Sequence, residues 1–190
     1  MATLFVDKLD PQSGTALEIG TSGDTITVPA GATINLSAAT QTGVGGANTP
    51  NFAAIKDDGQ QSITTSTYTK CTLNSVTFDT ASGWDATNNR WVVPSGEAGK
   101  YNVFASLETY CGSNDETVFL TQLRKNGSAF IQAQHQTMDD GNRHFFHSLN
   151  YILDLAVDDY LELWAFITGT SPTIRGDSPN TFMAISKLIE

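Results

Sequence analysis

Alternation of apolar and polar side chains is the main pattern in the second half of the chain. Residues 101–107 and 145–155 place apolar side chains mostly at every second position, which predicts strands with one buried face. Phe104 departs from this alternation and suggests a second contact on the other face of its strand. Residues 118–123 and 161–167 are apolar on both faces, as in strands buried between two layers or at a subunit contact.

The connections between these strands carry turn signals. Asn126-Gly127 is the strongest hairpin candidate, because both central residues of a type I′ turn need a positive φ. A last strand is expected over residues 181–189, and no segment longer than about 11 residues has apolar side chains at helical spacing. Several strands joined by turns leave a sandwich, a jelly roll or a barrel as the fold of residues 51–190.

Residues 1–42 have a different pattern, in which three alternating apolar pairs recur at spacings of 9 and 8 residues with glycine and proline between them. Strands this short cannot bury an apolar face within one chain, so the expected partner is a copy of the same chain. We predict an extended β-stem whose oligomeric core contains Leu17, Ile19, Ile26, Val28, Ile34 and Leu36. A flexible linker rich in small polar residues is the alternative. Residues 43–50 are predicted to be a Gly-rich hinge before the head.

Composition and charge limit the partners of the chain. It has 190 residues, a net charge of −10 and 16% charged residues, which suits one domain with a small appendage. Such a chain repels a phosphate backbone or an anionic bilayer, so neither nucleic-acid binding nor membrane insertion is expected. No apolar run approaches the roughly 20 residues of a membrane helix, and residues 1–10 lack a signal-peptide pattern. We expect a chain that begins at Met1 and is made in a cytoplasm.

Cysteine and histidine give weak signals for a metal site. Cys71 and Cys111 are too far apart in the sequence to form the close pairs of tetrahedral sites, and both are expected to be reduced and buried. His147 falls on the apolar face of its expected strand and His144 on the other face, which disfavours joint ligation. For these and for His135, a hydrogen-bonded core or interface histidine is favoured, and a three-nitrogen site on a trimer axis stays open. No metal or other cofactor is predicted.

Three loops carry side chains suited to a ligand. Trp84 and Trp91 bracket a polar segment that suits sugar binding, although packing at the end of the sandwich is favoured. Residues 138–142 suit a solvated turn or a cation site. Residues 175–177 spell the integrin-binding tripeptide, which we interpret as a coincidence in an exposed loop. The candidate ligand-facing residues are Trp84, Asn88, Trp91, Asp139, Asp140, Asn142, Arg175 and Asp177.

Motifs for catalysis are lacking in the sequence. Neither a Gly-x-Ser-x-Gly elbow nor a P-loop occurs, and no helix signal follows the glycines of residues 43–50. Acid pairs for glycoside hydrolysis come together in space rather than in sequence, but a depolymerising enzyme is usually much longer than this chain. The protein is therefore not predicted to be an enzyme.

Four elements give residues 70–190 a resemblance to a known family. They are Gly99-Lys100-Tyr101-Asn102-Val103, Leu123-Arg124-Lys125-Asn126-Gly127, residues 155–163, and Thr181-Phe182 with Leu188-Ile189. In this order they resemble the complement globular-head and tumour-necrosis-factor superfamily. The resemblance implies an all-β antiparallel jelly-roll sandwich that forms a compact homotrimer and binds partners without catalysis. It also implies a trimer interface of the head at Tyr101, Tyr160 and Phe182.

The sequence departs from this family pattern at a few positions. Asp158 stands in place of a turn glycine, Tyr160 stands near an apolar strand start, and Met183-Ala184 replaces a Ser-Gly pair. These departures concern loop details more than the topology of the strands.

The N-terminal segment carries a second resemblance. Residues 6–15 and 19–33 resemble the start of tail-fibre and other virion appendage proteins of tailed bacteriophages. A stem ahead of a jelly-roll head implies a trimeric virion fibre whose stem contacts other virion proteins. The expected start without a signal peptide agrees with a virion protein that is assembled in the host cytoplasm.

These patterns predict a non-enzymatic structural protein of a tailed-bacteriophage virion. The favoured function is host attachment by a homotrimeric tail fibre or appendage whose head binds a host-surface glycan or protein. The alternative is a capsid decoration, such as a cement protein or head fibre, or a tail adaptor without receptor binding. Labelling of host cells by the purified protein would separate the two.

Overall fold

A computed structural model describes residue 19 and residues 21–33, 49–113, 117–137, 141–176 and 179–188, with side chains described over the same ranges except at residues 113, 117 and 141–143. The chain divides into two compact units, residues 1–44 and residues 45–190. The division falls inside the Gly-rich segment at residues 43–50.

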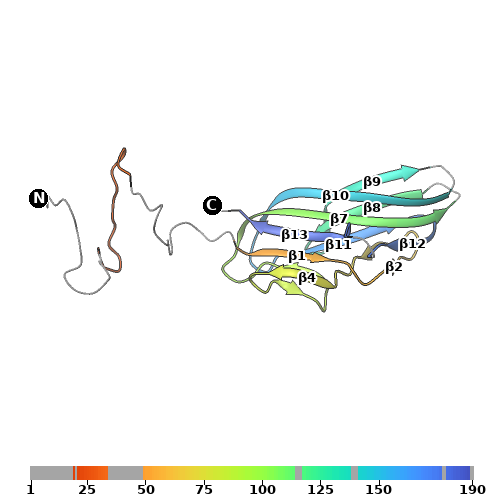
Figure 1. Cartoon of the computed structure of the whole chain (residues 1–190), viewed down its shortest axis with the longest axis horizontal. Coiled ribbons are helices and arrows are strands. Elements are labelled where there is room, and N and C mark those ends of the chain that lie inside the picture. The colour runs from red at the N-terminus through yellow and green to blue at the C-terminus, as the bar shows by residue number, and fades with distance from the viewer. Residues whose placement is uncertain are drawn as a thin grey trace, which may run out of the picture. The chain divides into compact units, whose positions relative to one another are not determined.

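The described part of the second unit is built of thirteen strands without a helix (Figure 1). They are β1 (Asn51–Ile55), β2 (Gln61–Ser62), β3 (Thr69–Lys70), β4 (Ser75–Asp79), β5 (Trp84–Asp85), β6 (Arg90–Val92), β7 (Gly99–Ser113), β8 (Thr117–Lys125), β9 (Ser128–Thr137), β10 (Gly141–Leu155), β11 (Tyr160–Ile167), β12 (Thr170–Ile174) and β13 (Phe182–Lys187). Where residues are described, no helix is long and apolar enough to cross a bilayer.

Two antiparallel sheets form the head. Sheet A has the order β2-β12-β7-β13-β1-β4, with β10 paired to the other side of β7. Sheet B has the order β5-β6-β11-β8-β9, and β3 pairs with β11 beside β6. The two longest strands, β7 and β10, lie side by side from Leu155 opposite Gly99 to Gly141 opposite Ser113 (Figure 1). The expected all-β antiparallel jelly-roll sandwich is confirmed.

Local turn chemistry accounts for the connections at one end of sheet B. Asn126 and Gly127 have φ angles of 53° and 78°, so the expected positive-φ hairpin joins β8 to β9. Asp158 has a φ of 68°, which explains why glycine suits this turn and why aspartate, a residue that tolerates the left-handed region, can replace it. Asp159 supports the same turn by accepting a hydrogen bond from the backbone N–H of Ala156 at 2.8 Å.

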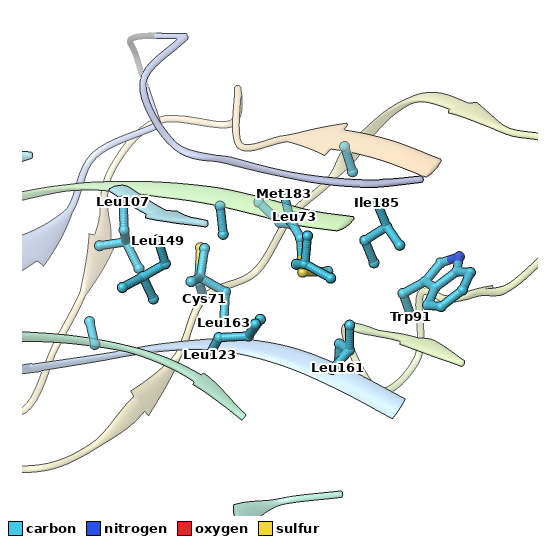
Figure 2. Close-up of a cluster of buried hydrophobic side chains, with 14 of the residues drawn as sticks. Cys71, Leu73, Trp91, Leu107, Leu123, Leu149, Leu161, Leu163, Met183 and Ile185 are labelled. Carbon is cyan, nitrogen blue, oxygen red and sulfur yellow. The ribbon is translucent and has the colours of Figure 1, made fainter. Parts of the chain in front are cut away.

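Apolar side chains from the two sheets meet between them (Figure 2). The buried residues labelled in the close-up are Leu107, Leu149, Met183 and Ile185 of sheet A, Trp91, Leu123, Leu161 and Leu163 of sheet B, and Cys71 and Leu73 of the segment between β3 and β4. Shortening a buried leucine to alanine typically costs about 2–5 kcal/mol of folding free energy. This core holds the outer faces of the two sheets in place.

The two cysteines belong to this core. Cys71 and Cys111 are both free and buried, as the sequence predicts. Burial raises the pKa of the Cys71 thiol to about 12, so the thiol stays protonated at neutral pH and is a poor nucleophile.

The described residues of the first unit contain turns and exposed apolar side chains. Asp24 accepts hydrogen bonds from the backbone N–H and the hydroxyl of Thr21 at 2.7 and 3.0 Å, and these bonds lower the pKa of its carboxyl group. Ile26 and Val28 are 63% and 41% exposed, and residues 21–33 contain no strand in this single chain. Ile19 is also exposed, while Leu17, Ile34 and Leu36 lie outside the described residues. The oligomeric stem stays a prediction.

Candidate functional site

The outer face of sheet A carries several exposed apolar side chains on neighbouring strands. Strand register places Phe78, Ala53, Ala184, Phe104 and Asn150 in one row across β4, β1, β13, β7 and β10. The neighbouring rows and Phe146 complete the surface, which we call the apolar face: Asn51, Ala53, Ile55, Phe78, Asn102, Phe104, Ser106, Phe146, Ser148, Asn150, Ile152, Phe182, Ala184 and Ser186.

Large side chains on the apolar face are open to solvent in the single chain. Phe146 and Ile152 are each 54% exposed, Phe78 is 47% exposed and Phe104 is 38% exposed. Between them lie small residues such as Ala184, and the charged outward positions of β7 and β10, Lys100, Glu108 and Asp154, lie toward the two ends of the face. A sheet face of this composition lets a second protein surface approach closely and exclude water, so it has the character of a protein interface.

Aromatic contact joins two strands of the apolar face. The rings of Phe104 and Phe182 meet edge to face, with centroids 5.1 Å apart. From the sequence, Phe104 is expected to make a second contact on the other side of its strand. The ring of Phe182 provides part of that contact. Phe146 and Ile152 were not among the predicted site residues, although both interrupt the polar positions of residues 145–155 and could have been found by the same parity argument.

The predicted interface residues of the head do not lie together. Tyr101 is fully buried on the inner face of β7, where its ring meets Trp91 at 5.4 Å and its hydroxyl donates to the carbonyl oxygen of Glu97. Burial raises the pKa of this tyrosine to about 12. Its assignment to a subunit interface is wrong, because the protomer core already covers it. Tyr160 begins β11 of sheet B, and only Phe182 lies on the apolar face.

The tryptophan loop is held by local packing and hydrogen bonds. Trp91 is fully buried, so its assignment as a ligand-facing residue is wrong and the packing interpretation holds. Trp84 is half-buried and stacks on Phe52 with centroids 5.2 Å apart. Asn88 is exposed and donates its side-chain amide to Asp85 at 2.7 Å, which lowers the pKa of that carboxyl group. Of the candidate ligand-facing residues of this loop, Trp84 and Asn88 keep surface open to solvent.

The other candidate loops are described in part. Asp139, Asp140 and Asp177 lie outside the described residues, and Asn142 of β10 is described by its backbone, which lies opposite Gly112 of β7. Their contact with a ligand stays a prediction.

The tripeptide at residues 175–177 begins inside the fold. Arg175 is half-buried and its N–H donates to the carbonyl oxygen of Glu108 at 2.9 Å. Gly176 is buried, and a Cβ there would collide with the carbonyl oxygen of Gly59. The interpretation of this segment as an exposed loop is therefore wrong for its first two residues.

His144 and His147 lie in different environments on opposite faces of β10, as the alternation of side chains along a strand predicts. His147 is half-buried toward the inner side of β10, and its Nδ1 lies 3.1 Å from the hydroxyl of Thr121. Burial, and secondarily the proximity of His135, lowers the pKa of His147. His144 is exposed on the opposite side of β10, with Nδ1 3.2 Å from a carboxylate oxygen of Glu108.

A metal centre and a pocket are two other kinds of candidate site. No group of three or more His, Cys, Asp or Glu residues in these ranges could hold a metal ion. A shallow hollow of about 190 Å³ is lined by Ala129, Phe130, Ile131 and Gln132 and contains no titratable side chain. The apolar face is therefore the stronger candidate for function.

Comparison with solved structures finds the same fold in tumour-necrosis-factor-like proteins. A crystal structure of murine APRIL at pH 5.0 matches 73% of this chain and 98% of APRIL with a TM-score of 0.50 at 13% identity. Eiger, a TNF from S. frugiperda, matches 76% of this chain and 95% of its own with a TM-score of 0.51 at 14% identity. At these identities the likeness shows the fold, a TNF-like jelly roll, and no more.

No family model matches the sequence, and no curated protein resembles it significantly.

Proposed function

We propose that the chain is a non-enzymatic homotrimeric binding protein, a fibre or appendage of a tailed-bacteriophage virion whose head attaches to a receptor on the host surface. The observation that carries the proposal is the apolar face of sheet A. Its exposed Phe146, Ile152 and Phe104 are costly in a monomer, because exposed apolar area stabilises a protein by about 25 cal/mol per Å² only when it leaves water.

A copy of the same chain is the partner that best suits this face. Its residues lie on five neighbouring strands, and a face of that extent suits the roughly 800 Å² per partner of a stable interface. Closed symmetry then removes the face from solvent in every copy. The sequence resemblance to trimeric jelly-roll heads and the TNF-like fold favour three copies.

The N-terminal segment supports assignment to a virion. Residues 6–15 and 19–33 resemble phage appendage stems, and three parallel copies would bury Ile26 and Val28, which are exposed in one chain. Such a stem leaves the head free to meet a receptor while the N-terminal end contacts other virion proteins.

The first test is the solution mass of the full chain by light scattering over a hundredfold range of concentration. The proposal expects about three times 20.4 kDa throughout. A monomer at every concentration would contradict the trimer.

The second test separates the attachment protein from the alternative. A receptor-binding appendage labels host cells and competes with infection. A capsid decoration or tail adaptor without receptor binding does neither, and antibodies to it mark the capsid or the tail junction in electron micrographs.

A further inference from the structure

The outer face of sheet B has a composition unlike that of the apolar face. One row across β3, β11, β8 and β9 consists of Lys70, Trp164, Gln122 and Gln132. Phe166, Leu120 and Gln134 form the next row. We call this region, with its neighbours, the aromatic–amide surface: Tyr68, Lys70, Gln122, Arg124, Gln132, Gln134, Glu162, Trp164 and Phe166.

Arg124 lies at the centre of the aromatic–amide surface. Its guanidinium carbon lies 4.1 Å from the ring centroid of Trp164 and 4.9 Å from that of Tyr68. Its Nε donates a hydrogen bond to the side-chain oxygen of Gln122 at 3.0 Å. Neither Nη atom has a hydrogen-bond partner or an ion pair among the described residues. Stacking and the Nε bond therefore hold the guanidinium in one orientation while its two outer nitrogens stay available as donors.

The other charges of this surface neutralise each other. The ammonium group of Lys70 pairs with the carboxylate of Glu162, which is 6% exposed, and the same carboxylate accepts a hydrogen bond from the indole N–H of Trp164 at 3.0 Å. Lys70 also donates to the carbonyl oxygen of Asn88 at 2.9 Å. Arg124 is therefore the one uncompensated charge of the surface, and it is positive although the chain has a net charge of −10.

Amide groups extend the surface along β9. Gln122 uses its amide nitrogen to bond Gln132 at 3.0 Å and the hydroxyl of Tyr68 at 3.2 Å. This leaves the amide nitrogen of Gln132 and both polar atoms of Gln134 without side-chain partners among the described residues, and both glutamines are exposed. Exposed amides beside aromatic rings offer donors and acceptors for hydroxyl groups and apolar surface for the C–H faces of sugar rings.

We propose that the aromatic–amide surface binds a glycan that contains a carboxylate-bearing sugar, with the carboxylate paired to the outer nitrogens of Arg124 and the hydroxyls bonded to Gln132 and Gln134. A planar guanidinium with two adjacent free donors matches a carboxylate in bidentate geometry. Tyr68, which is 38% exposed, supplies apolar surface for the sugar, while Trp164 and Phe166 are half-buried and support Arg124 and Tyr68 from below. This inference rests on the proposed function, because it gives the receptor of the head a chemical class.

Charge and polarity favour a sparsely charged glycan over other occupants. A copy of this chain would have to desolvate the exposed amides and Arg124, whereas the apolar face offers a copy far more apolar surface. A polyanion of high charge density is repelled by the net charge of −10. A single carboxylate amid hydroxyl groups avoids this repulsion, since charges beyond about 8 Å are screened at physiological ionic strength.

The test is titration calorimetry of the full chain with two matched pairs of saccharides. The first pair is an aldobiouronic acid, a disaccharide with one uronic acid, and its methyl ester, and the second is sialyllactose and lactose. The two acidic members carry the same group on different sugars, so they distinguish a uronic acid from a nonulosonic acid. We expect at least one acidic member to bind about tenfold tighter than its neutral partner and to shift the indole N–H resonance of Trp164.

Arg124→Gln is the decisive variant, and Arg90→Gln is its matched control. Arg90 also stacks on a ring, 4.5 Å from the centroid of Tyr160, but its Nε is bonded to Asp85 at 3.0 Å. Arg124→Gln should lower affinity about tenfold, Arg124→Lys should lower it less, and Arg90→Gln should leave it unchanged.

Three results would overturn the inference. They are equal affinity for acidic and neutral members, unchanged affinity in Arg124→Gln, and lack of binding to all four saccharides by a folded protein. Light scattering on the same samples keeps the two proposals distinct. A trimer that binds none of them contradicts only the glycan, while a monomer that binds one through Arg124 contradicts only the trimer.

Discussion

The two outer faces of the sandwich differ in composition and exposure, although antiparallel strands form both. On sheet A, outward positions hold phenylalanine, isoleucine, small residues and a few asparagines, and Phe146 and Ile152 stay more than half exposed. On sheet B, outward positions hold Trp164 and Phe166, but these are half-buried because Arg124, Lys70 and Tyr68 lie over them. Among the described residues nothing covers the outer face of sheet A, whereas side chains of sheet B and of Tyr68 cover most of the outer face of sheet B.

In our two proposals, this difference assigns assembly to sheet A and recognition to sheet B. A face rich in exposed apolar side chains gains free energy from any close-fitting cover, and in our proposal three copies of one chain provide that cover. A polar surface whose hydrogen bonds are already made gains little free energy when a copy binds to it, because one set of hydrogen bonds is only exchanged for another. It can instead select a ligand through the few donors that remain free, here the outer nitrogens of Arg124.

Charge placed on the apolar face should produce the largest effect. Phe146→Asp combined with Ile152→Asp puts two carboxylates where a partner would exclude water, and we expect the trimer to dissociate to a species of about 20.4 kDa. Each side chain is 54% exposed in the protomer, so the fold itself should survive. Light scattering and circular dichroism measure the two effects separately.

The matched control places the same charges on sheet B. Gln132→Asp with Gln134→Asp, on exposed positions of β9, should leave the mass unchanged. If these variants dissociate the protein and the apolar-face variants do not, the assignment of the two faces is reversed.

Removal of the shared carboxylate of sheet B should affect stability and not assembly. Glu162→Leu leaves Lys70 and the indole N–H of Trp164 without their acceptor, and we expect a loss of about 1–3 kcal/mol in the free energy of unfolding. Lys70 is 27% exposed and can recover some hydration, which favours the lower end of this range. Urea unfolding at fixed protomer concentration measures the change.

Glu162→Gln is the paired variant for this measurement. It keeps an oxygen acceptor for Trp164 and should lose less stability than Glu162→Leu. A change of mass in either variant would show that sheet B takes part in assembly.

Acidification should lower the free energy of unfolding through His147 of β10. The pKa of His147 lies below its ordinary value of 6.5 in the folded protein, so the unfolded chain binds the proton more readily. Stability is therefore present above about pH 6.5 and falls as the pH drops through the unfolded and then the folded pKa. Thermal unfolding between pH 7.5 and 5 should show this fall.

His147→Gln is expected to reduce the slope of that profile, because it removes the group that takes up the proton while a side-chain amide can still meet Thr121. A slope identical to that of the unaltered protein would assign the pH dependence to another group.

The smallest effect is expected at the margin of the apolar face. Phe78 lies on the edge strand β4 and is 47% exposed, so Phe78→Ser should change protomer stability by only about 0.5 kcal/mol. Its effect on the trimer dissociation constant should be weaker than that of Phe146→Ser. An equal effect would extend the interface across the full width of sheet A.

Local sequence was sufficient to predict the longer strands and the hairpin turn at Asn126-Gly127. The alternation in residues 101–107 and 145–155 and the Asn126-Gly127 pair foretell β7, β10 and the hairpin of β8 and β9. The same alternation groups Tyr101 with Val103 on the buried face, and it contradicts the interface role that the family resemblance implies for Tyr101. Parity along one strand was the better guide, because steric and packing constraints act on every second residue alike.

What the sequence by itself determined is which segments become strands and which side of each strand is apolar, since backbone sterics and side-chain polarity act over a few residues. Only the tertiary structure decided which strands lie beside each other. Phe104 meets Phe182, and Arg124 covers Trp164 and Tyr68, through pairings between distant segments. The alternation within one strand does not specify which strand it pairs with or in which register. The composition of the two outer faces therefore follows only from the pairing of all the strands.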